Sequence, residues 1–130
     1  MHDQDATRDQ IEELFQTWNA ALQTRDPGTV AALYAQDAIL LPTLSNEMRQ
    51  TPEAIEAYFT EFVKLHPIAT IIAQNIRIFG QIAMNSGLYS FAIINNGEIG
   101  NVIARFTFVY RQDSDGWKII EHHSSMMPES

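Results

Sequence analysis

The stretch that most constrains the fold runs from Asn101 to Met127 and has the pattern of two long strands joined by a tight turn. Its first half alternates between two sets of side chains, as a β-strand does. One set is Ala104, Phe106, Phe108 and Tyr110, and the other is Ile103, Arg105, Thr107 and Val109. Residues 113–116 form the turn, in which Gly116 can adopt the positive φ that other residues disfavour. An arginine on one strand and paired histidines and serines on the other indicate a pocket beside this hairpin.

Length and composition restrict the class of protein. A chain of 130 residues, 45% of them hydrophobic, fits one domain that buries roughly two thirds of its unfolded surface. The chain has no cysteine, which excludes disulfides, a thiolate nucleophile and a zinc–thiolate site. A net charge of −8 disfavours binding to nucleic acid or to an anionic membrane. We therefore expect a cytoplasmic protein without nucleic-acid or membrane partners.

The N-terminal half has the pattern of three helices. Residues 1–8 lack periodicity and are expected to form a flexible N-terminus, with a single domain over residues 9–130. The first helix has an apolar stripe at helical spacing, which consists of Ile11, Leu14, Phe15, Trp18 and Leu22. Asp26-Pro27 and Thr51-Pro52 each combine an N-cap with a proline at the first helical position, so two further helices start there. The second of the three would turn Val30, Leu33 and Tyr34 inward, and a brief strand is expected over residues 38–41.

From Ala69 onward the hydrophobic period changes to two, which predicts an antiparallel meander of strands. Helices followed by a sheet are typical of the α+β class. The strands are apolar on both faces, whereas a sheet with one solvated face alternates between apolar and polar residues. Because the helices can cover only one face, we expect the other to contact a second subunit, as a homodimer or larger homo-oligomer.

The segment ARFTFVYRQDSDGWKIIEHHSS resembles a known family, and LYAQDA at residues 33–38 and the helix around Tyr58 fit it as well. It is similar to the nuclear-transport-factor-2-like (SnoaL-like) superfamily, and within it to bacterial proteins that resemble the association domain of calcium/calmodulin-dependent protein kinase II (SgcJ/EcaC-type). The resemblance implies a cone-shaped fold with three N-terminal helices packed on a strongly curved antiparallel sheet. It also implies a cavity at the open end of the cone and pairing of subunits through outer sheet faces. The sequence has no dinucleotide or flavin motif, so no cofactor is expected.

Arg105 is the first candidate for the pocket. Its strand is apolar on both sides, and a buried guanidinium needs an anionic partner. One interpretation is an anchor for a ligand carboxylate, because the guanidinium offers a fork of donors. The alternative is an internal ion pair with Asp37 or Glu121.

His123 is the candidate catalytic residue, since a histidine of near-neutral pKa is a ready general base and Ser125 could orient it or bind the ligand. The alternative is that one histidine packs between strands while the other is solvated. Counting outward from the turn brings Arg105 and His123 together across the two strands, unless the register slips by one residue. No metal site is expected, because adjacent strand residues point to opposite faces.

Three aromatic residues complete the candidate ligand-binding set: Trp18, Tyr34 and Tyr58. Their spacing is that of a helical core, although a cone leaves its wide end unfilled and one or two could line the cavity. The predicted function is a small-molecule-binding domain with an anion-accepting cavity for a small carboxylate-bearing ligand. Two alternatives stay open, namely a homo-oligomeric assembly module without catalysis and a cofactor-free isomerase or cyclase.

Overall fold

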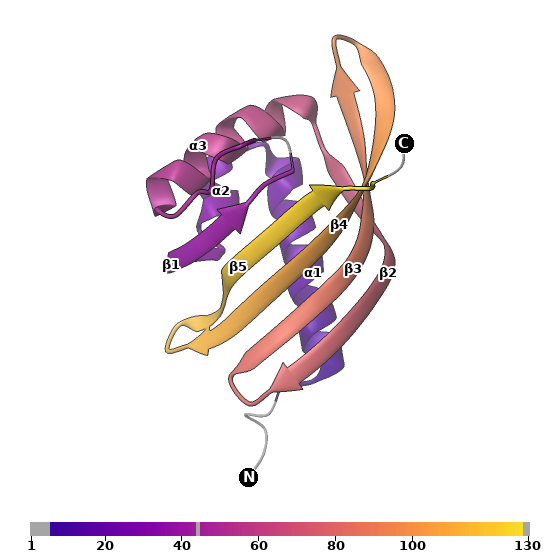
Figure 1. The fold of residues 1–130 in the computed structure, drawn as a ribbon. Coiled ribbons are helices and arrows are strands. Elements are labelled where there is room, and N and C mark those ends of the chain that lie inside the picture. Colours follow the sequence, from indigo (N-terminus) through magenta and orange to yellow (C-terminus); the bar gives the residue numbers. More distant parts are fainter. Residues whose placement is uncertain (1–5, 44, 129–130) are drawn as a thin grey trace.

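The computed structural model describes residues 6–43 and 45–128. The helices are α1 (Arg8–Thr24), α2 (Pro27–Ala31), α3 (Pro52–Phe62) and the single 3-10 turn η1 (Val63–Leu65). The strands are β1 (Tyr34–Leu41), β2 (Ile68–Phe79), β3 (Ile82–Asn95), β4 (Glu98–Asp113) and β5 (Gly116–Met126). Figure 1 shows the helices gathered on one side of a single strongly bent sheet. The α+β cone predicted from the sequence is confirmed.

The N-caps begin the three helices as the sequence predicts, with one shift in position. Asp26 accepts a hydrogen bond from the backbone N–H of Gly28, and Thr51 accepts one from that of Ala54. Helix α1 starts earlier than expected, because Thr7 forms a reciprocal capping box with Gln10. Thr7 is therefore the N-cap and Arg8 the first residue of the helix, so neither belongs to a flexible N-terminus. Ala6 is half-buried against the core, and residues 1–5 lie outside the described residues.

The sheet has the order β1-β5-β4-β3-β2, and its pairs are antiparallel except for β1 and β5, which are parallel. The prediction of a wholly antiparallel sheet is thus wrong for one strand. Strand β1 starts at Tyr34, opposite Ile119, so Tyr34 is a strand residue and not part of the second helix. This difference arises because the partner of β1 is about 85 residues away in the chain, and local patterns do not report such a pairing.

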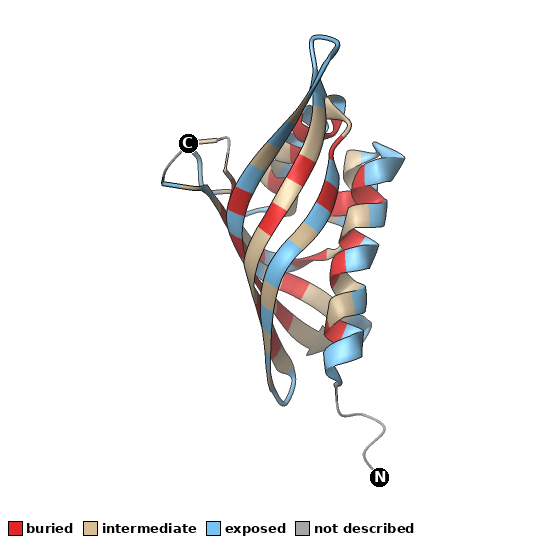
Figure 2. Cartoon of the chain, turned by 90° about the vertical axis from the view of Figure 1, so that its right-hand side faces the viewer, coloured by how far each residue is buried: buried red, intermediate tan, exposed pale blue. Residues whose placement is uncertain are grey.

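We call the sheet face that the helices cover the inner face and the opposite one the outer face. Figure 2 shows α1 lying against the inner face, with buried residues along the side of the helix that faces the sheet and in bands along the strands. On β4 the inner set is Ala104, Phe106, Phe108 and Tyr110, all buried. The rings of Phe106 and Phe108 pack around Phe15 and Trp18 of α1, and Tyr110 stacks on Phe108. The aromatic set therefore forms the core and is not available to another subunit.

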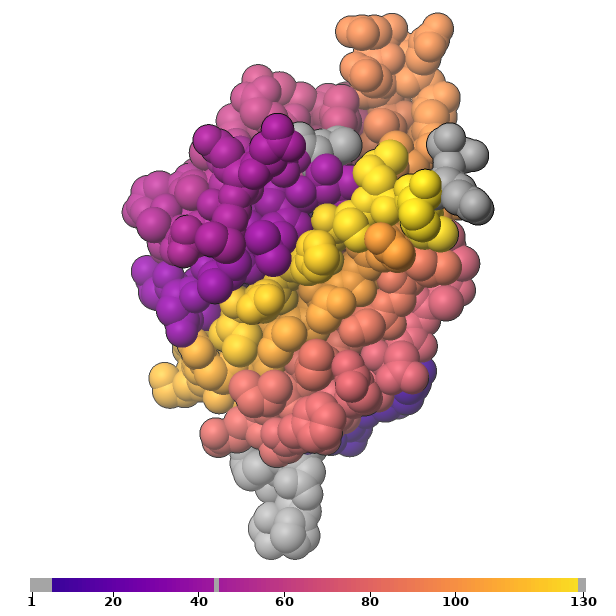
Figure 3. All heavy atoms as spheres, viewed as in Figure 1, coloured from indigo at the N-terminus to yellow at the C-terminus, as the bar shows by residue number. Residues whose placement is uncertain are grey.

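No described helix covers the outer face of the sheet, which Figure 3 shows over β2–β5. On β4 this face carries Ile103, Arg105, Thr107 and Val109, which are exposed or half-buried. The β3–β4 hairpin extends past the rest of the sheet (Figure 1) and carries two exposed isoleucines near its tip, Ile94 and Ile99.

A β-bulge in β5 determines which of its side chains face inward. Tyr110 pairs with Ile119, but Val109 pairs with Glu121, so Ile120 is an additional residue in β5. As a result, Ile119 and His122 both point to the core, although strict alternation would place them on opposite faces.

Candidate functional site

A cavity lies between α3 and the inner face of the sheet. Its volume is about 30 Å³, which is room for one or two water molecules. Most of its wall is apolar, from residues of α3, β3 and β4. The polar side chains that line it are Trp18, Thr43, Tyr58, Tyr89, His122 and Ser124. The site is therefore a small apolar cavity with hydroxyl and imidazole groups in its wall.

A series of hydrogen bonds connects buried side chains, from Trp18 of α1 to the wall of this cavity. The indole Nε1–H of Trp18 donates to Tyr34 Oη, which lies 3.2 Å away. Tyr34 Oη lies 2.8 Å from His122 Nδ1. These three side chains come from α1, β1 and β5, and each of them is buried.

The series continues from the other imidazole nitrogen to the cavity. His122 Nε2 lies 3.2 Å from Tyr89 Oη, which donates to Ser124 Oγ at 2.7 Å. Thr43 Oγ1 lies 2.5 Å from Ser124 Oγ. We call the complete set the buried polar chain: Trp18, Tyr34, His122, Tyr89, Ser124 and Thr43.

His122 is held as a neutral imidazole. Its ring stacks on Phe108 with a centroid separation of 4.0 Å, and the edge contact with Trp18 has a separation of 5.4 Å. Burial disfavours the imidazolium and, with the nearby His123, lowers the pKa of His122 from 6.5 to about 3. Because both ring nitrogens already have partners, His122 supplies hydrogen bonds without charge.

Burial acts on the tyrosines in the opposite sense, because it disfavours the phenolate. It raises the pKa of Tyr34 and of Tyr89 well above the ordinary value, and that of Tyr58 to about 12. These hydroxyls therefore keep their protons at neutral pH and act as hydrogen-bonding groups.

Several predicted ligand-binding residues do lie at the cavity. Trp18 and Tyr58 line it, and Tyr34 contacts it indirectly through His122. Arg49, in the connection after β1, lies over the ring of Tyr58, 5.8 Å from its centroid. Its guanidinium donates to the carbonyl of Ala54 and to Ser45 Oγ. Arg49 thus fastens the connection to α3 rather than lining the cavity.

Arg105, His123 and Ser125 do not face this cavity, so the prediction that they converge in it is wrong. Arg105 pairs with Ser125 and Thr107 pairs with His123, and all lie on the outer face. For Arg105 the sequence pattern was ambiguous, because both faces of β4 carry apolar residues and the aromatic set occupies the inner one. For His123 and Ser125 the bulge at Ile120 is responsible, because it turns His122 and Ser124 inward instead.

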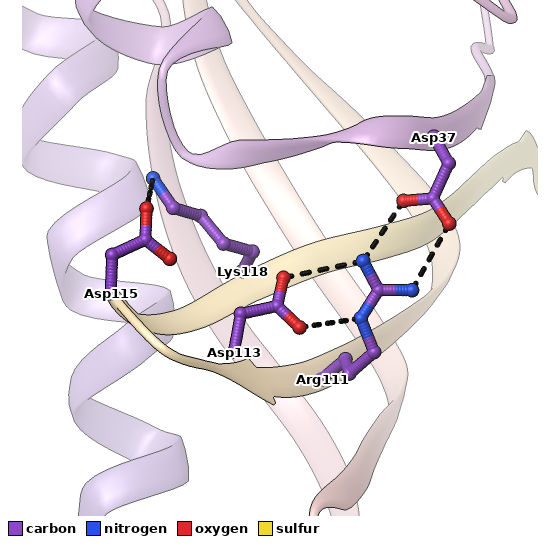
Figure 4. Close-up of polar contacts among 5 residues, drawn as sticks. All are labelled: Asp37, Arg111, Asp113, Asp115 and Lys118. Atoms are coloured by element: carbon purple, nitrogen blue, oxygen red, sulfur yellow. Dashed lines mark hydrogen bonds and ion pairs between the residues drawn. The ribbon is translucent and has the colours of Figure 1, made fainter.

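Arg111, at the end of β4, pairs with two carboxylates (Figure 4). Its guanidinium donates to both oxygens of Asp37 at 3.0 and 2.9 Å, and to Asp113 Oδ1 at 2.7 Å. These hydrogen bonds lower the pKa of Asp37. We call Arg111, Asp37 and Asp113 the surface ion cluster. Asp37 therefore forms an ion pair, but its partner is Arg111 and not Arg105.

Sequence reasoning missed Tyr89 and Thr43. Tyr89 has a usable signal, because it is a hydroxyl-bearing aromatic residue at an inward position of a long strand. Thr43 follows Pro42 in a polar connection and has no comparable signal in the sequence. No group of three or more metal-ligating side chains that could hold a metal ion occurs within residues 6–43 and 45–128. Among the described helices, none has the length and hydrophobicity to cross a membrane.

Comparison with known proteins identifies the fold and the family. Over residues 7–128 the chain matches the family described as calcium/calmodulin dependent protein kinase II association domain. A solved structure from Xanthomonas campestris, described as belonging to the same kind of domain, shares 44% identity with a TM-score of 0.94, covering 98% of this chain and 93% of that one. A comparison with curated proteins found no match.

More distant structures share only the fold. A nuclear transport factor 2-like protein from Salmonella enterica has 16% identity and a TM-score of 0.80, covering 94% of this chain and 92% of that one. A protein from Parabacteroides distasonis described as a ketosteroid isomerase has 21% identity and a TM-score of 0.70, covering 92% and 86%. The chain has the nuclear transport factor 2-like fold and belongs to the calcium/calmodulin dependent protein kinase II association domain family.

Proposed function

We propose that this chain is a small-molecule-binding domain whose ligand occupies the cavity between α3 and the inner sheet face. The observation that carries the proposal is the buried polar chain, which ends at hydroxyl groups in an otherwise apolar wall. Binding sites for small molecules commonly combine an apolar lining with a few convergent polar groups. If this region only packed the core, apolar side chains would fill it at a lower desolvation cost, because each buried polar group must find a hydrogen-bond partner.

The anion-accepting form of this function has less support. The described residues that line the cavity include no arginine, lysine, aspartate or glutamate, and His122 is neutral. A carboxylate buried there would lose its hydration without gaining a cationic partner. The same composition disfavours an isomerase that needs a carboxylate base in the cavity. Binding without acid–base catalysis is therefore the function that we favour.

Because the cavity is small, a ligand larger than a few atoms requires its lining side chains to move. The test is a fragment screen by thermal shift and by NMR, with two valines of β4 as a matched pair. Val102 lines the cavity, whereas Val109 lies half-buried on the outer face. Val102→Phe should fill the cavity and remove the effect of any fragment that stabilises the wild type, and Val109→Phe should retain it. A fragment effect that survives Val102→Phe, or the absence of any binding fragment, would contradict the proposal.

A second candidate function, homo-oligomeric assembly, is favoured by the outer face of the sheet. Ile72 and Ile103 are 51% and 46% exposed there, and Ile99 on the projecting hairpin is 79% exposed. Large apolar side chains on an uncovered sheet face are typical of subunit interfaces. Light scattering at micromolar concentration should give at least a dimer, and Ile103→Lys should weaken it. A monomeric wild type would exclude this second function.

A further inference from the structure

The buried polar chain has a definite direction, because its first member can only donate. An indole N–H has no acceptor capacity, so Trp18 must donate to Tyr34 Oη. The hydroxyl hydrogen of Tyr34 is then donated to His122 Nδ1, an acceptor 2.8 Å from Tyr34 Oη. If His122 Nδ1 carried the hydrogen instead, Tyr34 would receive two donors, and its own buried hydrogen would have no acceptor, which is unfavourable.

The same donor-to-acceptor direction continues through the His122 imidazole, from Nδ1 to Nε2. A neutral imidazole carries one N–H, so with Nδ1 as acceptor the hydrogen is on Nε2. Nε2–H donates to Tyr89 Oη, which leaves the Tyr89 hydrogen for Ser124 Oγ at 2.7 Å. Every hydrogen from Trp18 to Tyr89 therefore points toward Ser124.

At the cavity wall, one hydroxyl hydrogen has no acceptor within the buried polar chain. Ser124 and Thr43 have two hydroxyl hydrogens between them, and their 2.5 Å contact uses one. Tyr89 Oη is already an acceptor for His122 and donates its own hydrogen to Ser124 Oγ. The second hydrogen of the Ser124–Thr43 pair is thus available to a molecule in the cavity that both side chains line.

We propose that the ligand of this cavity is a neutral molecule with an acceptor oxygen, such as a ketone or amide carbonyl, that receives the free hydroxyl hydrogen of the Ser124–Thr43 pair. This inference rests on the proposed small-molecule-binding function and specifies the class of ligand. A ligand that could only donate, such as an ammonium group, would face a donor hydrogen instead of a lone pair. The apolar wall formed by α3 and β3 would take the hydrocarbon part of the ligand.

The direction of the chain can be tested without any ligand. Long-range ¹H–¹⁵N NMR distinguishes the two neutral tautomers of histidine, and His122 is expected to stay neutral between pH 5.5 and 8. The expected result is the tautomer with hydrogen on Nε2. Tyr34→Phe removes the donor to Nδ1 and should shift the tautomer ratio, whereas a merely space-filling Tyr34 would leave it unchanged. Hydrogen on Nδ1 in the wild type would overturn the inference.

The ligand class is tested with probes of matched shape. Cyclopentanone and methylenecyclopentane differ in whether the ring carries C=O or C=CH₂, and cyclopentylamine and cyclopentanecarboxylate supply a cation and an anion. We expect cyclopentanone to bind about tenfold more tightly than methylenecyclopentane, which corresponds to about one good hydrogen bond. The amine and the carboxylate should bind more weakly than the ketone.

Two neighbouring serines serve as variant and control. Ser124→Ala should remove the preference for the ketone, with Thr43→Val as a second variant on the same hydroxyl pair. Ser125→Ala, on the opposite face of β5, should leave the preference intact. Equal affinity for the ketone and the alkene would overturn this inference while leaving the proposed function in place. Binding by none of the probes and by no screened fragment would overturn both.

Discussion

The buried polar chain and the surface ion cluster satisfy their polar groups in opposite ways. The buried polar chain consists of neutral hydroxyl, indole and imidazole groups, and burial keeps His122 uncharged. The surface ion cluster consists of formal charges, and Asp37 remains exposed to solvent. An unhydrated charge is expensive in the interior, whereas neutral groups are tolerated there once each has a partner. The difference shows that this fold excludes charge from its cavity and keeps it at the β4–β5 turn.

The largest effect that we expect from this contrast is a loss of stability in acid. The pKa of His122 is lowered in the folded state to about 3, compared with 6.5 in an exposed histidine. Below pH 6.5 the unfolded chain therefore binds a proton that the folded chain does not. The free energy of unfolding should fall by about 4 kcal/mol between pH 6.5 and 3.5 from this group alone. Urea denaturation at a series of pH values measures it, most cleanly above pH 4.5, where carboxylates contribute less.

The control for the acid effect is the neighbouring histidine. His123→Gln should leave most of the slope of stability against pH in place, because burial is the larger cause of the low pKa of His122, whereas His122→Gln should remove it. If the slope disappears with His123→Gln, then His123 and not His122 is the buried histidine.

Removing the central member of the buried polar chain should have the next largest effect. His122→Ala leaves Tyr34 and Tyr89 without their shared partner and creates a cavity beside Phe108. We expect a loss of about 3 kcal/mol. His123→Ala removes an exposed side chain and should change stability by less than about 0.5 kcal/mol. Equal losses in the two variants, measured by chemical denaturation, would remove the distinction between the two faces of β5.

A smaller effect is expected at the turn that carries the surface ion cluster. Gly116 has a φ of +111°, which a β-branched residue adopts only with strain. Gly116→Val should therefore cost about 1 kcal/mol or more. Gly100 has no positive φ, and a side chain there would meet open space, so Gly100→Val is the matched control. If both variants melt at the same temperature as the wild type, the turn does not depend on this backbone conformation.

The smallest effect concerns the surface ion cluster itself. Asp37→Asn removes the carboxylate that pairs with Arg111, at a site where solvent screens the charges. The melting temperature should fall slightly in low salt and match the wild type in 1 M NaCl, because the Debye length is then about 3 Å. The pairing lowers the pKa of Asp37, so its contribution is present above pH 4 and disappears as the carboxylate is protonated. A deficit that persists in high salt would indicate a role in packing.

The parts of the fold that were predictable from sequence depend on local signals. Asp26 and Thr51 were recognised as caps because a capping side chain and its backbone partners lie within three residues of each other. A brief strand was predicted at residues 38–41, but its start at Tyr34 and its parallel pairing with Ile119 were missed, since that pairing is not local. Phe106 and Phe108 could be assigned to one face together, but which face was inner depended on the position of α1.

The site was less predictable than the fold. Trp18 and Tyr58 were identified because aromatic residues at helical spacing point toward the sheet. Arg105 was misplaced because apolar neighbours on a strand indicate burial only when the other face is polar. His123 was chosen over His122 because the additional residue Ile120 has no signature in an uninterrupted hydrophobic strand.

The bulge at Ile120 has a consequence for how related sequences are compared. In this chain, counting residues from the turn selects His123 as the inward histidine, although His122 is the buried one. A relative with one residue fewer between the turn and the histidine pair would form the same sheet without a bulge, and there the count would give the correct answer. An aligned HHSS motif therefore does not by itself identify the buried imidazole, and the number of residues that precede it must be considered together with the pairing of β4 and β5.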